Sequence, residues 1–234
     1  MCGRYTAVPG RRDEIADRLG VALDAETARL ATDRYNVAPR QRIAVVEATE
    51  DGTRRGRAAR WGLLPRWAKT SRDRMQPINA RADALLRSKL WRPLLERPSR
   101  RVLIPATGWY EWLHAEARGE RPAPFHHVVD GGAVFAFAGL MSTTRVDDLD
   151  EPITTAAIIT TAANGPARRL HDRMPVVLAD PAEQAAWLSP DLGAEDLVAL
   201  LAPLADDRVE LRPASRAVNS VRNEGPQLLA PDPA

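Results

Sequence analysis

The sequence predicts one α+β domain with a mixed or antiparallel sheet. Its 234 residues are 44% hydrophobic and 27% charged, which suits one globular domain or at most two small ones and argues against disorder as the main state. Strand and helix patterns do not alternate strictly along the chain, as a doubly wound parallel sheet would require. No internal repeat or linker divides the chain, so we assign residues 1–225 to one domain and residues 226–234 to an irregular tail.

The first half of the chain contains both kinds of pattern. Ile15 and Leu19, at i, i+4 spacing, predict a helix over 12–19, and β-branched residues predict a strand over 43–48. A second strand is expected over 53–64, broken at Gly56. A helix is expected over 81–97 because five leucines share one helical face, and Pro93 is expected to bend it. These leucines are Leu85, Leu86, Leu90, Leu94 and Leu95.

From residue 101 onward the pattern is mainly one of strands. We expect strands over 101–104 and 109–113, followed by two runs on either side of Asp130-Gly131-Gly132, a tripeptide typical of a hairpin turn. Further strands are expected over 153–162, 175–178 and 209–213. Helices are expected over 181–188, which has a proline in its first turn, and over 195–201.

Composition excludes several classes of protein. No run of eighteen or more apolar residues occurs, and no apolar stretch follows a basic start in MCGRYTAVPGRRDE, so we expect a cytoplasmic protein without a membrane span. A single cysteine cannot form an internal disulfide. Together with the four scattered histidines, His114, His126, His127 and His171, it gives no zinc-binding spacing. We therefore expect neither a metal nor an organic cofactor.

Charge is unevenly distributed although the formal net charge is only +2. Residues 1–110 hold 23 Arg and Lys against 12 Asp and Glu, and residues 52–101 hold 15 against 3. Arginines interleaved with Trp61, Trp67 and Trp91 are typical of proteins that hold single-stranded nucleic acid. The alternative is a solvated basic face. Lys69 and Lys89 are the only lysines, so the arginine excess can also reflect genomic base composition.

The single cysteine is the second residue, where a structural role would be unusual because chain termini are normally mobile. Removal of Met1 would leave Cys2 with a free α-amine and a thiol on adjacent carbons. Their ordinary pKa values, about 7.7–8.0 and about 8.5, leave both partly nucleophilic near neutral pH. An aldehyde could then form an imine with the amine and, after addition of the sulfur, a five-membered thiazolidine. The alternative is that Cys2 is incidental, and retention of Met1 would abolish the chemistry.

Seven short blocks extend over almost the whole chain: MCGRY at the start, RYNVAP at 34–39, WGLLPRWAK at 61–69, INAR at 78–81, GWYEW at 108–112, LHDRMP at 170–175 and SRAVNSVRNEG at 215–225. Together and in this order they resemble the SOS-response-associated peptidase (SRAP) family, proteins that shield abasic sites. The resemblance implies a mixed, largely antiparallel sheet, curved or closed into a barrel and flanked by helices. It also implies a monomer that acts in DNA repair in the cytoplasm, at the nucleoid.

The same resemblance implies a reaction and its substrate. Mature Cys2 would capture the ring-opened aldehyde of an abasic deoxyribose in single-stranded DNA, or at a junction between single and double strands, as a thiazolidine crosslink. The process would be stoichiometric or slowly reversible, with lyase-like chemistry at the abasic sugar. The peptidase part of the name would correspond to release of Met1, by self-cleavage or by an aminopeptidase.

Three further catalytic residues follow from the resemblance. Asn79 would position the amine or thiol of Cys2, although it could instead cap a helix beginning near Arg81. Glu111 would be the general acid and base, since flanking aromatic residues would desolvate it, although a solvent-facing position on a strand is an alternative. His171 would assist opening of the sugar ring. The other histidines suit strand packing or surface positions, or a polar loop for His114.

The resemblance also implies a set of DNA contacts. Basic side chains next to the reactive blocks would hold phosphates, Trp67 would stack on bases, and a third group would shape the same channel. The alternatives are surface ion pairs for the arginines and a core or rim position for Trp67. Thr70 and Ala82-Asp83 depart from the family's usual residues. The phosphate-holding residues would be Arg4, Arg81 and Arg173, and the channel residues Asn36, Pro39 and Arg216.

Two other functions fit the same residues. One is an N-terminal-nucleophile amidohydrolase or cysteine peptidase, in which Cys2 attacks an amide and its own amine is the base. The other is a module that binds single-stranded nucleic acid without a covalent bond.

Overall fold

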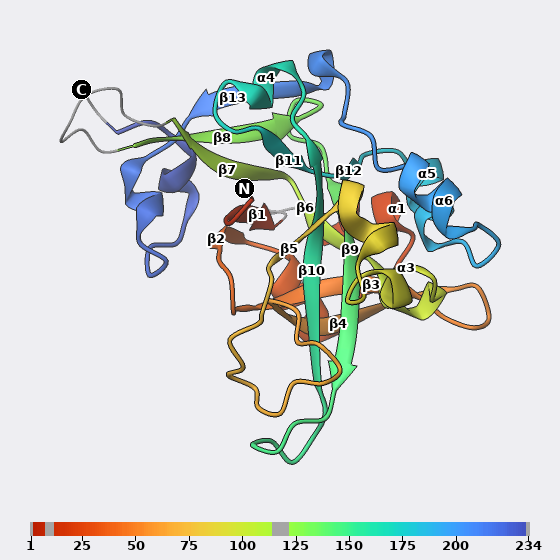
Figure 1. The fold of residues 1–234 in the computed structure, drawn as a ribbon. Coiled ribbons are helices and arrows are strands. Elements are labelled where there is room, and N and C mark those ends of the chain that lie inside the picture. Colours follow the sequence, from red (N-terminus) through yellow and green to blue (C-terminus); the bar gives the residue numbers. More distant parts are fainter. Residues whose placement is uncertain (1, 8–11, 114–121, 233–234) are drawn as a thin grey trace.

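Strands of two sheets and short helices make up the computed structural model, which describes residues 2–7, 12–113 and 122–232 (Figure 1). Five of the strands pair in a closed cycle, in which each strand has two neighbours from the same set. β4 (Arg54–Trp61) pairs with β3 (Arg42–Ala48), β3 with β6 (Arg101–Ala106), β6 with β9 (Phe135–Thr144), and β9 with β10 (Ile153–Ala162). β10 then pairs in parallel with β4, so these five strands form a closed ring.

Three short strands extend this eight-stranded sheet. β5 (Asn79–Arg81) runs parallel to β10, while β11 (Arg173–Pro175) and β12 (Val177–Leu178) pair antiparallel with β10 and β9. The sheet is therefore mixed and largely antiparallel, as the α+β prediction requires.

A smaller sheet of five antiparallel strands lies beside the ring and carries the N-terminus. Its order is β13 (Val209–Pro213), β8 (Ala123–Val129), β7 (Gly108–Leu113), β1 (Tyr5–Ala7) and β2 (Arg34–Val37). β1 is held on both sides, because Tyr5 is opposite Val37 of β2 and Trp109 of β7.

Alternating side chains of the larger sheet enter two different hydrophobic clusters. Ala44 and Val46 pack in the cluster beneath the helices, while Ile43 and Val45 pack in a second cluster shared with the smaller sheet. Strand periodicity therefore divides the core into a helix-covered layer and a layer between the sheets. The second layer also contains Cys2.

Short helices and 3-10 turns complete the chain, and the helices labelled at the right of Figure 1 cover the first cluster. Among the described residues, no helix is long and apolar enough to cross a membrane. The helices are α1 (Arg12–Leu19), α2 (Ala25–Ala31), α3 (Arg92–Leu95), α4 (Gly165–Arg168), α5 (Pro181–Leu188) and α6 (Ala194–Ala199), and the 3-10 turns are η1 (Ala82–Arg87), η2 (Pro98–Arg100), η3 (Asp206–Arg208), η4 (Arg216–Asn219) and η5 (Pro226–Leu229).

Most strand predictions are confirmed, but the hairpin at Asp130-Gly131-Gly132 is wrong. A turn does occur there, and the amide of Gly132 donates to the carbonyl of Val129. However, β8 continues into the smaller sheet and β9 into the larger one, so the two strands separate after the turn. The predicted break at Gly56 is also wrong: β4 continues through it, and a side chain there would collide with Leu23 and Thr27 next to β4.

The continuous helix predicted over 81–97 is wrong as well. The segment consists of η1, a break at Ser88 and the single turn α3. The hydroxyl of Ser88 accepts hydrogen bonds from the amides of Leu90 and Trp91, and these local bonds replace the helical pattern. The predicted strand over 175–178 is divided between β11 and β12. Sequence periodicity did not predict β1, β2, β5, α2 or α4, all of which are short.

Candidate active site and adjoining grooves

Cys2 lies where the two sheets meet, and its side chain is fully buried. It belongs to the same hydrophobic cluster as Tyr5, Trp61 and Trp109. Burial raises the pKa of the Cys2 thiol well above its ordinary value, and the nearby Glu111 carboxylate raises it further. The thiol in this arrangement is therefore protonated at neutral pH.

Asn79 contacts Cys2 directly. Its side-chain amide, Nδ2, donates a hydrogen bond of 2.9 Å to the Cys2 carbonyl oxygen. The strand pairing that brings Asn79 there is parallel to β10, with Asn79 opposite Ile158. Its Oδ1 atom is buried and has no hydrogen-bond partner among the described residues. The helix-capping alternative is wrong, since Arg81 occupies the N-cap position of η1 and provides no side-chain cap.

Glu111 faces the layer between the sheets. It is 5% exposed, and strand alternation puts its side chain on the same face of β7 as Trp109, which packs in that layer. The solvent-facing alternative is therefore wrong. Its negative charge raises the pKa of the Cys2 thiol, which lies in the same layer between the two sheets.

His171 has two competing partners for the same ring nitrogen. Its Nδ1 atom accepts a hydrogen bond of 3.0 Å from the backbone amide of Arg173 and lies 2.7 Å from Oδ1 of Asp172. The neutral ring can accept from the amide, and the protonated ring can donate to the carboxylate. This ring nitrogen therefore contacts both a hydrogen-bond donor and a carboxylate.

The other histidines differ. His126 and His127 are buried in β8, where His127 stacks on Trp109 at a centroid distance of 4.4 Å. Burial lowers the pKa of His126 to about 4 and that of His127 to about 3, so both rings are neutral at pH 7. The packing prediction for this pair is confirmed. His114 lies outside the described residues.

Arg81 and Arg173 are linked by one carboxylate. Asp83 contacts Arg81 at 2.6 Å and Arg173 at 3.2 Å, and hydrogen bonding to Arg81 together with the charge of Arg173 lowers the pKa of Asp83 to about 2. The two arginine side chains differ in their exposure to solvent. The Arg81 side chain is 64% exposed, whereas that of Arg173 is 15% exposed and also donates to the carbonyl of Thr160 at 2.6 Å.

Arg4 and Asn36 connect the N-terminal strand to the C-terminal segment. One Arg4 nitrogen donates to Oδ1 of Asn36 and to the carbonyl of Val218, each at 2.7 Å. The amide of Asn36 donates in turn to the carbonyls of Ser220, at 3.0 Å, and Asn223, at 2.9 Å. Both side chains are therefore largely occupied by contacts within the protein.

The remaining predicted DNA-binding residues are dispersed. Pro39 is half-buried in the turn between β2 and β3, and Arg216 is exposed at η4. Of the three tryptophans in the basic region, Trp61 and Trp91 are buried, whereas Trp67 is 60% exposed. Only Trp67 among them can stack on a base without rearrangement.

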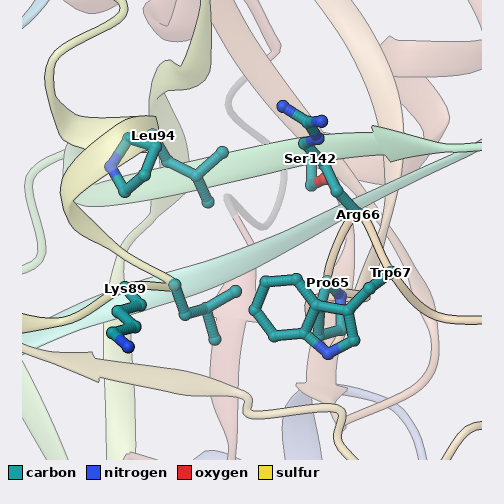
Figure 2. A pocket seen from close by; sticks show the side chains of 8 residues that line it. Pro65, Arg66, Trp67, Lys89, Leu94 and Ser142 are labelled. Carbon is teal, nitrogen blue, oxygen red and sulfur yellow. The ribbon is translucent and has the colours of Figure 1, made fainter.

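A cavity of about 540 Å³ adjoins Asn79 and Arg81. Its other walls include Arg74, Gln76 and Leu90. Leu90 also lines a neighbouring cavity of about 230 Å³, in which Trp67 and Arg66 lie on one side and Lys89 and Leu94 on the other (Figure 2). The cavity at Asn79 and the cavity at the exposed Trp67 are therefore neighbours, with Leu90 in the wall of both.

Sequence reasoning missed Asp83 as the link between two arginines and missed the walls formed by Lys89 and Arg66. The interleaving of basic and aromatic residues was a signal for this region as a whole. It did not distinguish exposed side chains from structural ones such as Arg101, which is buried and donates to the carbonyls of Leu95 and Trp187. Among the described residues, no group of three or more His, Cys, Asp or Glu side chains is arranged to hold a metal ion.

The chain is similar to known proteins over nearly its whole length. The family described as "SOS response associated peptidase (SRAP)" matches residues 1–221. Abasic site processing protein YoaM from Bacillus subtilis (strain 168) is 35% identical over 232 residues, covering 98% of this chain and 97% of its own length. Abasic site processing protein YedK from Escherichia coli (strain K12) is 28% identical, covering 99% of this chain and 100% of its own.

Solved structures show the same fold. A crystal structure of a protein from Bacteroides thetaiotaomicron aligns with a TM-score of 0.83 and 21% sequence identity, covering 99% of this chain and 100% of that one. A protein from Bordetella bronchiseptica aligns with a TM-score of 0.74 and 22% identity, covering 92% of this chain and 100% of that one.

Proposed function

Because the chain belongs to the SOS response associated peptidase (SRAP) family, we propose that it processes abasic sites in single-stranded DNA by a covalent reaction at Cys2. Its relatives in Bacillus subtilis and Escherichia coli are named abasic site processing proteins. The observation that carries the proposal is the setting of Cys2. Its carbonyl is held by Asn79, its thiol lies near Glu111, and a cavity opens beside Asn79.

The reaction begins with hydrolysis of the peptide bond between Met1 and Cys2, which consumes one water and frees the Cys2 amine. The ring-opened abasic sugar presents an aldehyde at C1′. The amine adds to this carbon and water leaves, giving an imine. The sulfur then adds to the same carbon while its proton is transferred away, and a five-membered thiazolidine closes. The two steps at the sugar form one C–N and one C–S bond and release one water.

Glu111 takes the proton that the thiol loses in the second step. The raised pKa of the thiol keeps the sulfur protonated until the imine has formed, so the amine is the first nucleophile. A carboxylate next to the thiol can accept that proton and pass it to the imine nitrogen, which becomes the N–H of the thiazolidine ring.

Asn79 and His171 have separate tasks. Asn79 fixes the backbone of Cys2 through the 2.9 Å hydrogen bond and leaves its unpartnered Oδ1 available to the freed amine. His171 transfers a proton during opening of the sugar ring, and its Nδ1 atom lies 2.7 Å from the Asp172 carboxylate.

DNA is held mainly by the exposed groups near this cavity. Arg81 contacts a phosphate, and Trp67 stacks on a base next to the abasic site. Arg173 and Arg4 support the site from within the protein, through Asp83 and Asn36 respectively. A single strand is preferred because the aldehyde carbon must reach Cys2 without a paired strand in the way. We assign the activity to a monomer at the nucleoid, in the cytoplasm.

One experiment separates this function from the others. Purified protein is incubated with single-stranded DNA carrying one abasic site, then heated in denaturant and run on a gel. The proposal predicts a heat-stable adduct that Cys2→Ala abolishes. Binding that is lost on denaturation would support a non-covalent module instead, and turnover of an amide substrate without an adduct would support an amidohydrolase.

A further inference from the structure

A third cavity continues the path away from Cys2. It has a volume of about 380 Å³ and shares four wall residues with the Trp67 cavity: Arg66, Pro93, Leu94 and Ser142. Its remaining walls are basic or hydroxyl-bearing: Arg97, Arg100, Thr143, Thr144 and Arg145. We call the four arginines of this cavity, Arg66, Arg97, Arg100 and Arg145, the arginine groove. It neighbours the Trp67 cavity, which in turn shares Leu90 with the cavity at Asn79, so the three cavities form a series of neighbours.

The charge along this series is of one sign. Among the described residues, those that line the three cavities include seven Arg or Lys side chains and no Asp or Glu. Other hollows on the molecule differ, since the one between β4 and the loop before β10 is lined by Glu26, Asp150 and Glu151 as well as by arginines. The absence of carboxylates is therefore a property of this series and does not follow from the arginine-rich composition alone.

Among the described residues, little negative charge faces the arginine groove. Within the described residues, the guanidinium groups of Arg66, Arg97 and Arg100 form no ion pair or hydrogen bond, and that of Arg145 donates to the carbonyl of Asp150 at 3.3 Å. The acidic residue near Arg100 is Glu47, and it is already paired with Arg55 at 2.7 Å. Burial and the neighbouring charges of Arg97, Arg57 and Arg66 lower the pKa of Arg100, as expected for positive charges that converge on one place.

The shape of the groove suits an extended polyanion. Pro93 and Leu94 provide an apolar wall between the arginines. Arginine guanidiniums are common donors to phosphate oxygens, and an apolar wall can contact sugars. A single small anion would leave most of these groups unused.

We propose that the arginine groove binds the phosphodiester backbone of the DNA that flanks the abasic site on one side. This inference rests on the proposed function, because the flanking strand reaches the groove through the cavities at Asn79 and Trp67. The flanking strand then contributes affinity without touching the reacting atoms.

The test measures binding of single-stranded oligonucleotides that carry a tetrahydrofuran abasic analogue, which has no aldehyde and so cannot crosslink. Two series are used, one lengthened only on the 5′ side of the analogue and one only on the 3′ side. The wild-type affinity should rise with length in one series until the groove is filled. The triple variant Arg97→Gln, Arg100→Gln, Arg145→Gln should lose that rise. Its salt slope, log Kd against log salt, should fall by up to about 2, at about 0.7 per lost phosphate contact.

A matched triple variant controls for net charge. Arg18→Gln, Arg29→Gln and Arg212→Gln remove the same charge at exposed positions outside the three cavities. If the two triple variants show the same length dependence and salt slope, the proposal is overturned. Because Arg100 is partly buried, the double variant Arg97→Gln, Arg145→Gln provides a second test at two exposed positions.

Failure of the two proposals can be told apart. A short abasic oligonucleotide that ends before the groove should crosslink at the wild-type rate in the groove variants. Absence of any crosslink in the wild-type protein would contradict the proposed reaction, yet the binding series with the unreactive analogue would still decide whether the groove holds DNA.

Discussion

Replacement of Asn79 by alanine is the most direct perturbation of the arrangement around Cys2. It removes the 2.9 Å hydrogen bond from Nδ2 to the Cys2 carbonyl and leaves β5 paired with β10, because that pairing uses only backbone atoms. The bond contributes about 1 kcal/mol net, which corresponds to about fivefold in rate if it persists in the transition state. A shift of the reacting amine by about 1 Å would cost about 100-fold. We therefore expect crosslinking to slow by between about fivefold and about 100-fold.

The assay for Asn79→Ala is single-turnover crosslinking to abasic single-stranded DNA at saturating protein, followed on denaturing gels. The control is Asn219→Ala, which removes an exposed amide that accepts a hydrogen bond from Trp112. DNA affinity should change little in either variant. A rate for Asn79→Ala within twofold of wild type, in protein of unchanged fold, would refute the positioning role.

Three further predictions concern the carboxylate, the buried histidines and one glycine. Glu111→Gln removes the charge that helps raise the pKa of the cysteine thiol, so alkylation of that thiol by iodoacetamide should accelerate. Crosslinking should slow in the same variant, and alkylation and crosslinking rates that both rise or both fall would contradict the proton-transfer role. His126 and His127 are neutral when folded and take up protons on unfolding below their ordinary pKa of 6.5, so stability should fall as the pH is lowered. The loss should be about 2 kcal/mol per ring between pH 7 and pH 5, and urea unfolding of His127→Leu should show a reduced loss. Gly108→Ala would push a methyl group into the His126 ring and the His127 carbonyl and should lower the free energy of unfolding by about 1–3 kcal/mol. Gly193→Ala, whose new methyl group would make only ordinary contacts, should lower it less, and equal thermal stability of the two variants would contradict the described register of β7 and β8.

Local sequence patterns predicted where individual strands lie better than they predicted which strands pair with each other. The run over 153–162 is rich in β-branched residues and forms β10 over those residues. The tripeptide at 130–132 correctly indicated a turn, because glycines tolerate the positive φ angles found there. Whether the strands on either side pair with each other depends on which sheet each completes, and the turn residues carry no information about that.

The leucine pattern over 81–97 predicted burial but not helix continuity. Leu85, Leu94 and Leu95 all lie in the helix-covered core. The chain reaches that core in two short turns, since Ser88 bonds to the backbone that follows it. Hydrophobic spacing alone does not distinguish one helix from two turns that bury the same side chains.

The candidate site was accessible from sequence only through the family resemblance. The chemistry of an N-terminal cysteine follows from Cys2 itself, but its contact with Asn79 joins residues 77 positions apart. The burial of Glu111 and the link from Arg81 through Asp83 to Arg173 depend in the same way on strand pairing. Spacing in the chain cannot reveal these contacts, because β5, β7, β10 and β11 meet only in the folded sheets.

Intact mass spectrometry of the protein before and after incubation with abasic single-stranded DNA tests the central claim most directly. The account predicts a purified chain that lacks Met1, and an adduct whose mass equals that chain plus the oligonucleotide minus one water, with the bond located at Cys2 by digestion. A chain that retains Met1 and gains no mass, or an adduct bonded at another residue, would contradict it.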